Sequence, residues 1–79
     1  MKIRFRNTKQ IEDFVKIAKF FKSNIKVTDS AQTYIADGKS AAEIAILGTG
    51  KILIVDFEDH TSGERVMFES QVEALGIVR

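Results

Sequence analysis

Cysteine is absent from this 79-residue sequence, and histidine occurs only once, as His60. Without cysteine the chain forms no disulfide and performs no thiol chemistry, so a reducing cytosol is the compartment that suits it best. A transition-metal site usually recruits several histidine or cysteine ligands. The sequence therefore predicts no metal site, and nothing in it calls for another cofactor.

Long hydrophobic runs are also missing. The apolar stretch at residues 52–55, which no other stretch exceeds in length, is far below the roughly 20 residues that a membrane-spanning helix needs. Residues 1–6 alternate basic and apolar side chains and lack the core of a signal peptide. With 44% hydrophobic and 29% charged residues, the composition is that of an ordinary globular protein. We therefore expect residues 1–79 to form one cytoplasmic domain with no membrane association.

Charge is unevenly distributed along the chain. Residues 1–26 carry eight basic and two acidic side chains, a balance of +6, whereas residues 27–79 carry four basic and nine acidic ones, a balance of −5. The basic third would attract an acidic protein or a nucleic acid. We favour a solvated face or an acidic protein, because most phenylalanines nearby are needed in the core; Phe20 alone falls beside the apolar stripe.

The clearest local pattern predicts a helix from about Thr8 to Lys22. Its apolar residues follow the spacing of a helix laid on a core, namely Ile11, Phe14, Val15, Ala18 and Phe21. Asn7 is placed to cap this helix, with Gln10 as a weak capping-box partner. Two acidic residues, Glu12 and Asp13, are expected near the positive end of the helix dipole.

The remaining pattern predicts four strands and two further helices. The strands are Lys2–Arg6, Asn24–Thr28, Thr33–Ala36 and Lys51–Glu58, and the helices are Ser40–Leu47 and Gly63–Leu75. Ser40 and Glu43 form a capping box, Thr61 and Glu64 offer another, and Gly48 and Gly76 are placed to end helices. The order β-α-β-β-α-β-α predicts an α+β open-faced sandwich, a four-stranded antiparallel sheet with helices on one face.

The stretch from Lys51 to Glu58 is apolar on both faces, which is typical of a central strand. The open side of the sheet would then expose either Ile52 and Ile54 or the set Leu53, Val55 and Phe57. Contiguous exposed apolar surface usually marks an interface. We therefore predict a partner at this face, with a homodimer as one form of it.

Two stretches resemble HPr, the histidine-containing phosphocarrier protein of the bacterial sugar phosphotransferase system. The first is F-V-K-I-A-K-F-F-K-S-N-I-K-V-T, residues 14–28, which is similar to the first helix and second strand of that family. The second is D-G-K-S followed by L-G, within residues 37–48, which resembles its short second helix. The resemblance implies the HPr-like sandwich, with strand order 1-4-2-3.

The defining motif of the family, Gly-Ile/Leu-His-Ala/Thr-Arg-Pro, begins its first helix. The alignment implied by the resemblance puts Asn7 at the histidine position, Thr8 after it, Lys9 at the arginine position and Gln10 at the proline position. An amide has neither the basicity nor the nucleophilicity of imidazole, so we expect Asn7 to accept no phosphoryl group. Lys9 keeps the positive charge without the planar geometry of arginine.

The resemblance therefore implies a regulatory or adaptor module rather than an enzyme. Its partners would be proteins, either components of the phosphotransferase system or a regulator. The expected contact residues are Asn7, Thr8, Lys9, Gln10, Ser40, Ile44 and Leu47. In some relatives a regulatory serine, which Ser40 matches, is phosphorylated, and Lys39 lies next to it. We favour a capping role for Ser40, since Glu43 departs from the apolar patch of those relatives.

The alternative is an active phosphoryl carrier that uses His60 as its acceptor. Its neighbours Glu58 and Asp59 would repel phosphate, which favours an ordinary loop histidine. The stretch Gly48-Thr-Gly50-Lys51 lacks the spacing of a P-loop and fits a turn better. Basic-face nucleic-acid binding remains a weaker alternative.

Overall fold

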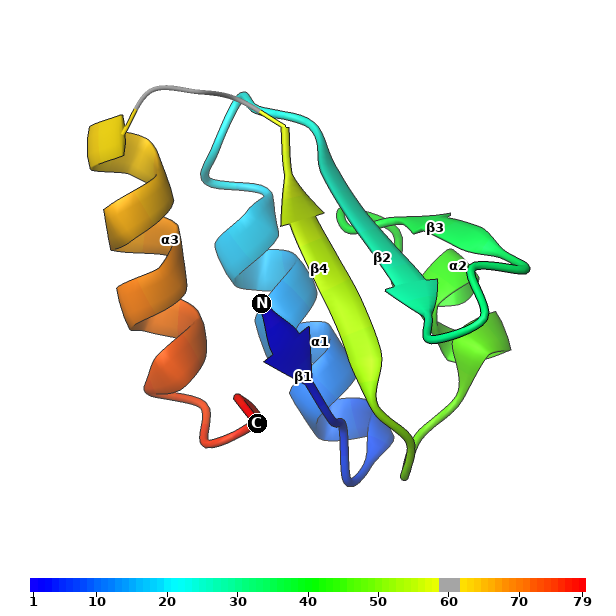
Figure 1. Ribbon diagram of the computed structural model, residues 1–79. Coiled ribbons are helices and arrows are strands. Elements are labelled where there is room, and N and C mark those ends of the chain that lie inside the picture. The colour runs from blue at the N-terminus through cyan, green and yellow to red at the C-terminus, as the bar shows by residue number, and fades with distance from the viewer. Residues whose placement is uncertain (59–61) are drawn as a thin grey trace.

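The computed structural model describes residues 1–58 and 62–79. Its elements follow the predicted order: β1 (Lys2–Ile3), α1 (Thr8–Ala18), β2 (Ile25–Asp29), β3 (Ile35–Asp37), α2 (Ala41–Leu47), β4 (Leu53–Phe57) and α3 (Ser62–Glu73). The strands form one sheet in the order β1-β4-β2-β3, and each neighbouring pair is antiparallel. Figure 1 shows the helices gathered on one face of the sheet, with α1 between α2 and α3. The predicted α+β architecture and strand order are confirmed.

Strand β4 is central, as its two apolar faces predict. Ile54 lies opposite Lys2 of β1 on one side and Thr28 of β2 on the other. The alternate residues of β4 face the helices and are buried, namely Leu53, Val55 and Phe57. Ile52 and Ile54 are therefore the apolar residues on the open side, and both are half-buried.

The open face of the sheet is less apolar than the sequence predicts. One row across the strands joins Ile54, Thr28 and Ile35, but the next row joins Asp56, Lys26 and Asp37. Because apolar and charged rows alternate, the face offers no broad apolar surface of the kind that typifies an interface.

The chain itself covers the β1 edge of the sheet. Beside β1, Val78 forms a bridge with Ile3, and the Arg4 amide donates to the Ile77 carbonyl at 2.8 Å. At the β3 edge, the Asp37 amide donates to Glu43 Oε1 at 3.1 Å. Uncovered edge amides would be templates for a further strand. The β1 edge is therefore closed to a further strand.

The loop between β2 and β3 is fixed in a similar way. The Thr33 amide donates to Asp29 Oδ1 at 2.8 Å, and the Thr33 hydroxyl donates to the other oxygen of that carboxylate. These hydrogen bonds lower the pKa of Asp29, with the hydroxyl as the largest cause. The sequence places Asp29 in the turn, whereas the structure includes it in β2 as the acceptor that closes the turn.

The core lies between the sheet and the helices. The predicted stripe of α1 is buried there, including Ile11, Phe14, Val15 and Ala18. Phe68 of α3 packs against three other rings, those of Phe14, Phe21 and Phe57, with centroid distances of 5.9, 5.6 and 5.2 Å. Edge-to-face ring pairs add stability beyond the area that they bury.

Several predicted boundaries are displaced by a few residues. Helix α1 ends at Ala18 rather than Lys22, because the amides of Phe20 and Phe21 bond to carbonyls three residues back. Phe21 stays buried through this tight turn. Strand β1 stops at Ile3, although burial keeps alternating as far as Phe5. Periodicity alone therefore does not fix the residue at which an element ends.

The ends of α3 are described only in part. Gly76 follows this helix with φ 74°, and its amide donates to the Glu73 carbonyl at 3.0 Å, so Gly76 ends the helix as predicted. The predicted capping role of Thr61 lies outside the described residues. Within those residues, none of the helices is both long enough and apolar enough to cross a membrane.

Candidate functional site

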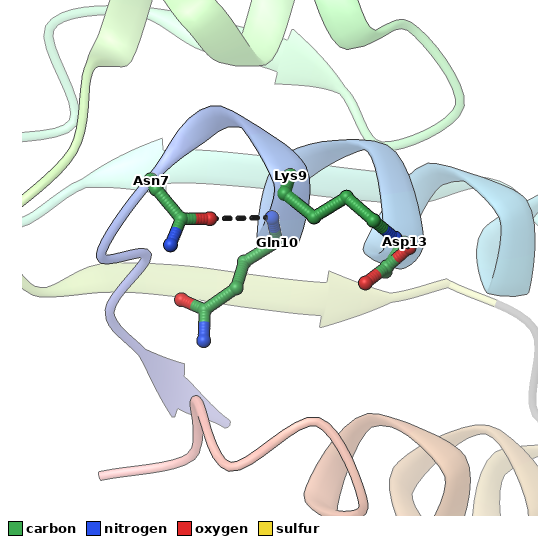
Figure 2. Close-up of polar contacts among 4 residues, drawn as sticks. All are labelled: Asn7, Lys9, Gln10 and Asp13. Atoms are coloured by element: carbon green, nitrogen blue, oxygen red, sulfur yellow. Dashed lines mark hydrogen bonds and ion pairs between the residues drawn. The ribbon is translucent and has the colours of Figure 1, made fainter.

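The amino end of α1 is held by two side-chain amides. Asn7 has extended backbone angles, and its Oδ1 accepts a hydrogen bond from the Gln10 amide at 3.0 Å (Figure 2). The Gln10 side chain bonds in turn to the residue before Asn7: its Oε1 accepts a hydrogen bond from the Arg6 backbone amide at 2.7 Å. The predicted capping role of Asn7 is confirmed. Its side-chain oxygen accepts from one of the backbone amides that have no partner within the helix, which is the role of an N-cap residue.

The charge of Lys9 is partly compensated. Its Nζ lies 2.6 Å from Asp13 Oδ1, one helical turn away (Figure 2). This hydrogen bond, together with the nearby carboxylate charge, raises the pKa of Lys9. The first turn of α1 contains no acidic residue, so the expected placement of Glu12 and Asp13 beside the dipole is wrong by about one turn. Asp13 instead positions the Lys9 ammonium along the exposed side of the helix.

The amino end of α2 is capped by Ser40. Its Oγ accepts from the Glu43 amide at 3.2 Å, as the capping box predicts. The reciprocal half of the box is absent, because the Glu43 carboxylate accepts from the Asp37 amide instead. The Ser40 amide donates to the Asp37 carbonyl at 3.0 Å.

The surroundings of Ser40 disfavour phosphorylation. The carboxylate of Glu43 and that of Asp37, whose Oδ1 accepts from the Lys39 amide at 2.9 Å, lie on the segments that flank it. Lys39, the nearest cation in sequence, directs its ammonium to the Phe21 carbonyl. A phosphate on Ser40 would therefore meet two like charges without a poised cation. This geometry supports the capping role of Ser40.

Two of the expected contact residues lie in the core. Ile44 is 0% exposed and Leu47 is 3% exposed. A partner cannot reach either side chain while α2 stays packed, so the prediction that they bind a partner is corrected here. The outward residues of α2 are Ala42, Ala45 and Ile46. Ile46, at 68% exposed, is the large apolar side chain that this helix presents to solvent.

Helices α1 and α2 run in opposite directions. The Gly50 amide, just beyond α2, donates to the Phe5 carbonyl at 2.8 Å, while Lys39, just before α2, reaches the Phe21 carbonyl. Asn7 and its neighbours therefore lie beside the carboxyl end of α2, and Ser40 lies beside the opposite end of α1. At 1.5 Å per residue, the length of α1 separates these two sites by roughly 16 Å.

The other sequence candidates that lie in the described residues assemble no reactive group. Gly48 and Gly50 have positive φ, at 87° and 83°, and shape the turn that leads to β4. Glu58 pairs with Lys26 at 3.0 Å, and Asp56 points to solvent on the open face. In residues 1–58 and 62–79 no three histidine, cysteine or acidic side chains are placed to hold a metal ion. His60 lies outside the described residues.

The sequence pattern underestimates the exposure of one side chain, that of Phe20. Phe20 follows α1 and is 86% exposed, more than any other large hydrophobic residue of the described chain. The signal was its place off the apolar stripe, between Ala18 and Phe21.

No protein-family model and no curated protein sequence matches this chain.

The capping geometry leads to a stability prediction. Replacing Asn7 with alanine should lower the free energy of unfolding by about 1 kcal/mol, because the Gln10 amide loses its acceptor. Asn7→Asp keeps an acceptor oxygen and should stay within a few tenths of a kcal/mol of the parent. Urea denaturation followed by circular dichroism measures both variants. Equal stability of all three proteins would contradict a capping role for Asn7.

Proposed function

We propose that this chain is an HPr-like adaptor of the bacterial cytoplasm that binds proteins of the sugar phosphotransferase system without carrying phosphate. The observation that carries the proposal is the side chain at the amino end of α1. Where the HPr family has its phosphorylated histidine, this chain has Asn7, and the oxygen of Asn7 is engaged in capping. The strand order 1-4-2-3 supports the same assignment.

The proposed docking surface joins the amino end of α1 to the outward face of α2. On α1 it comprises Thr8 and Lys9, which are exposed, and Gln10, which is half-buried. On α2 it includes Ile46 near the carboxyl end, which the antiparallel packing brings toward the start of α1. An exposed isoleucine and an exposed ammonium group at the same end of the helix pair suit a partner with a small apolar site and an acidic rim.

Competition with authentic HPr tests the adaptor role. The chain should slow the transfer of phosphate from phosphoenolpyruvate to HPr by the general phosphotransferase enzyme, and it should accept no phosphate itself. Reversing the charge in Lys9→Glu should raise the inhibition constant by about tenfold, because a like charge would then face the acidic rim. Lys2→Glu, the same reversal on the open sheet face, is the matched control and should inhibit like the parent.

Restoring the family residues tests the resemblance separately. The double variant Asn7→His, Lys9→Arg should accept an acid-labile phosphate from the same enzyme, since imidazole would then stand at the helix amino end. A parent protein that becomes phosphorylated, and loses this property in His60→Ala, would overturn the adaptor proposal in favour of the carrier alternative. Failure of both competition and phosphate transfer would overturn the assignment to this system.

A further inference from the structure

Phe20 is the centre of a small basic surface. Its ring is 86% exposed, and Lys16, Lys19 and Lys22 lie within one helical turn of it in sequence, all three exposed. In the part of the chain that the structure describes, no carboxylate forms an ion pair with any of these lysines. We call Phe20 with these three lysines the Phe20 patch. An exposed aromatic ring among uncompensated cations suits a partner that offers an apolar hollow with an acidic rim.

The same molecule contains an acidic hollow with one exposed apolar residue. A surface cavity of about 360 Å³ lies at the end of β2 and β3, next to the start of α2. Its acidic lining comes from Asp37, Glu43 and Glu58, and its exposed apolar residue is Ile35; Ile25 and Ala36 also line it but are buried. We call this set the acidic cavity. Ile35 is 56% exposed, so its side chain is open to a docking ring.

The charge of the acidic cavity is negative even after its own ion pair is counted. Lys26 also lines the cavity and pairs with Glu58 at 3.0 Å. The carboxylates of Asp37 and Glu43 accept hydrogen bonds from backbone amides, and no cation of the described residues forms an ion pair with them. Two uncompensated negative charges therefore remain beside the apolar lining.

We propose that Phe20 of one copy of this chain docks into the acidic cavity of a second copy. A cavity of about 150 Å³ lined by apolar groups already accommodates a benzene molecule, so the acidic cavity has room for the ring of a phenylalanine. The lysines of the Phe20 patch would then face Asp37 and Glu43. The contact would use the part of the open sheet face that contains Ile35 and Asp37. It does not use the end of α1 assigned to the adaptor role, and it stands independently of that role.

The contact is heterologous, since it joins two different surfaces. Each copy has one Phe20 patch and one acidic cavity, so association can continue from copy to copy. One aromatic anchor with a few charges makes a small interface, and we expect weak association, with a dissociation constant of about 0.1–1 mM. A single-stranded nucleic acid fits less well, because it needs a row of stacking rings and gains nothing from an acidic cavity.

Sedimentation equilibrium of the full chain tests the proposal. At millimolar protein and ~0.1 M salt the average mass should exceed the 8.9 kDa of one chain. It should fall toward that value in ~1 M salt, because the Debye length shrinks from ~10 Å to ~3 Å. A single-chain mass at every concentration in low salt would overturn the proposal.

Two variants that each lose one surface make the test specific. Phe20→Ser keeps the acidic cavity, and Ile35→Lys keeps the Phe20 patch, and both residues are exposed, so both variants should fold. Each alone should associate at least about tenfold more weakly than the parent. Mixed together they should form a dimer of one copy of each, which cannot grow further.

The control is Val66→Ser, which removes another exposed apolar side chain from outside both surfaces. It should associate like the parent. If the two single-surface variants associate normally, if their mixture stays monomeric, or if the control alone abolishes association, the proposed contact is wrong.

Discussion

Replacing Phe68 with alanine is expected to lower the free energy of unfolding by about 3–5 kcal/mol. Phe68 is 1% exposed and contacts the rings of Phe14, Phe21 and Phe57, which come from α1, from the turn after it and from β4. The substitution leaves a cavity where α3 meets these elements. A domain of this length is typically stable by roughly 4–12 kcal/mol, so the variant should lose a large share of its stability. Urea denaturation gives the value.

Met67→Ala is the matched control for this substitution. Met67 is the preceding residue of α3 and is 58% exposed. Its truncation should change the unfolding free energy by less than about 0.5 kcal/mol. If Phe68→Ala and Met67→Ala have similar effects, α3 is not anchored through the ring cluster.

The features of the fold that depend on a single helix or strand were predictable from the sequence. The stripe of α1 and the central position of β4 follow from residue spacing, and both are confirmed. Strand order is different, because it depends on which elements meet across the chain. The order 1-4-2-3 was available only through the HPr resemblance, since an antiparallel sheet of four strands has several orders with equally good periodicity.

The candidate site was predictable to a smaller extent. The capping role of Asn7 follows from the local sequence. The ion pair of Lys9 with Asp13 is also predictable, because a spacing of four residues favours such pairs on a helix. The HPr resemblance assigns Ile44 and Leu47 to a partner, although their spacing of three residues is that of a core stripe. In a helix of only two turns, this spacing distinguishes a buried face from an exposed one weakly.

The separation of Ser40 from Asn7 could not be read from the sequence. It arises because α1 and α2 pack in opposite directions, fixed by contacts such as that from Lys39 to the Phe21 carbonyl. The acidic cavity has the same origin, since Glu43 comes from α2 and Glu58 follows β4. Local spacing carries no information about contacts of this range.

Gly38→Ala should destabilise the protein by about 1–3 kcal/mol through overpacking. Gly38 follows β3, and its amide donates to the Ile25 carbonyl at 2.7 Å. A Cβ there would lie 2.6 Å from Ile25 Cγ2 and 2.9 Å from Ile25 O. Because one of the two atoms belongs to the backbone, trimming the isoleucine cannot relieve the contact. The β2 and β3 strands must move apart, which would weaken their ladder.

The control for Gly38→Ala is Gly63→Ala in α3. A Cβ on Gly63 meets no atom within 4 Å, and alanine favours a helix over glycine by up to about 1 kcal/mol, so this variant should be slightly stabilised. Urea denaturation separates the two effects by sign, and amide exchange locates them. Faster exchange at Ala36 and Val27 in Gly38→Ala, with α3 unchanged, is the expected pattern. If both glycine variants are stabilised, the close approach of Gly38 to Ile25 does not constrain the strand pair. The hydrogen bond from Asp37 to Glu43 would then be the contact that holds β3 beside the acidic cavity.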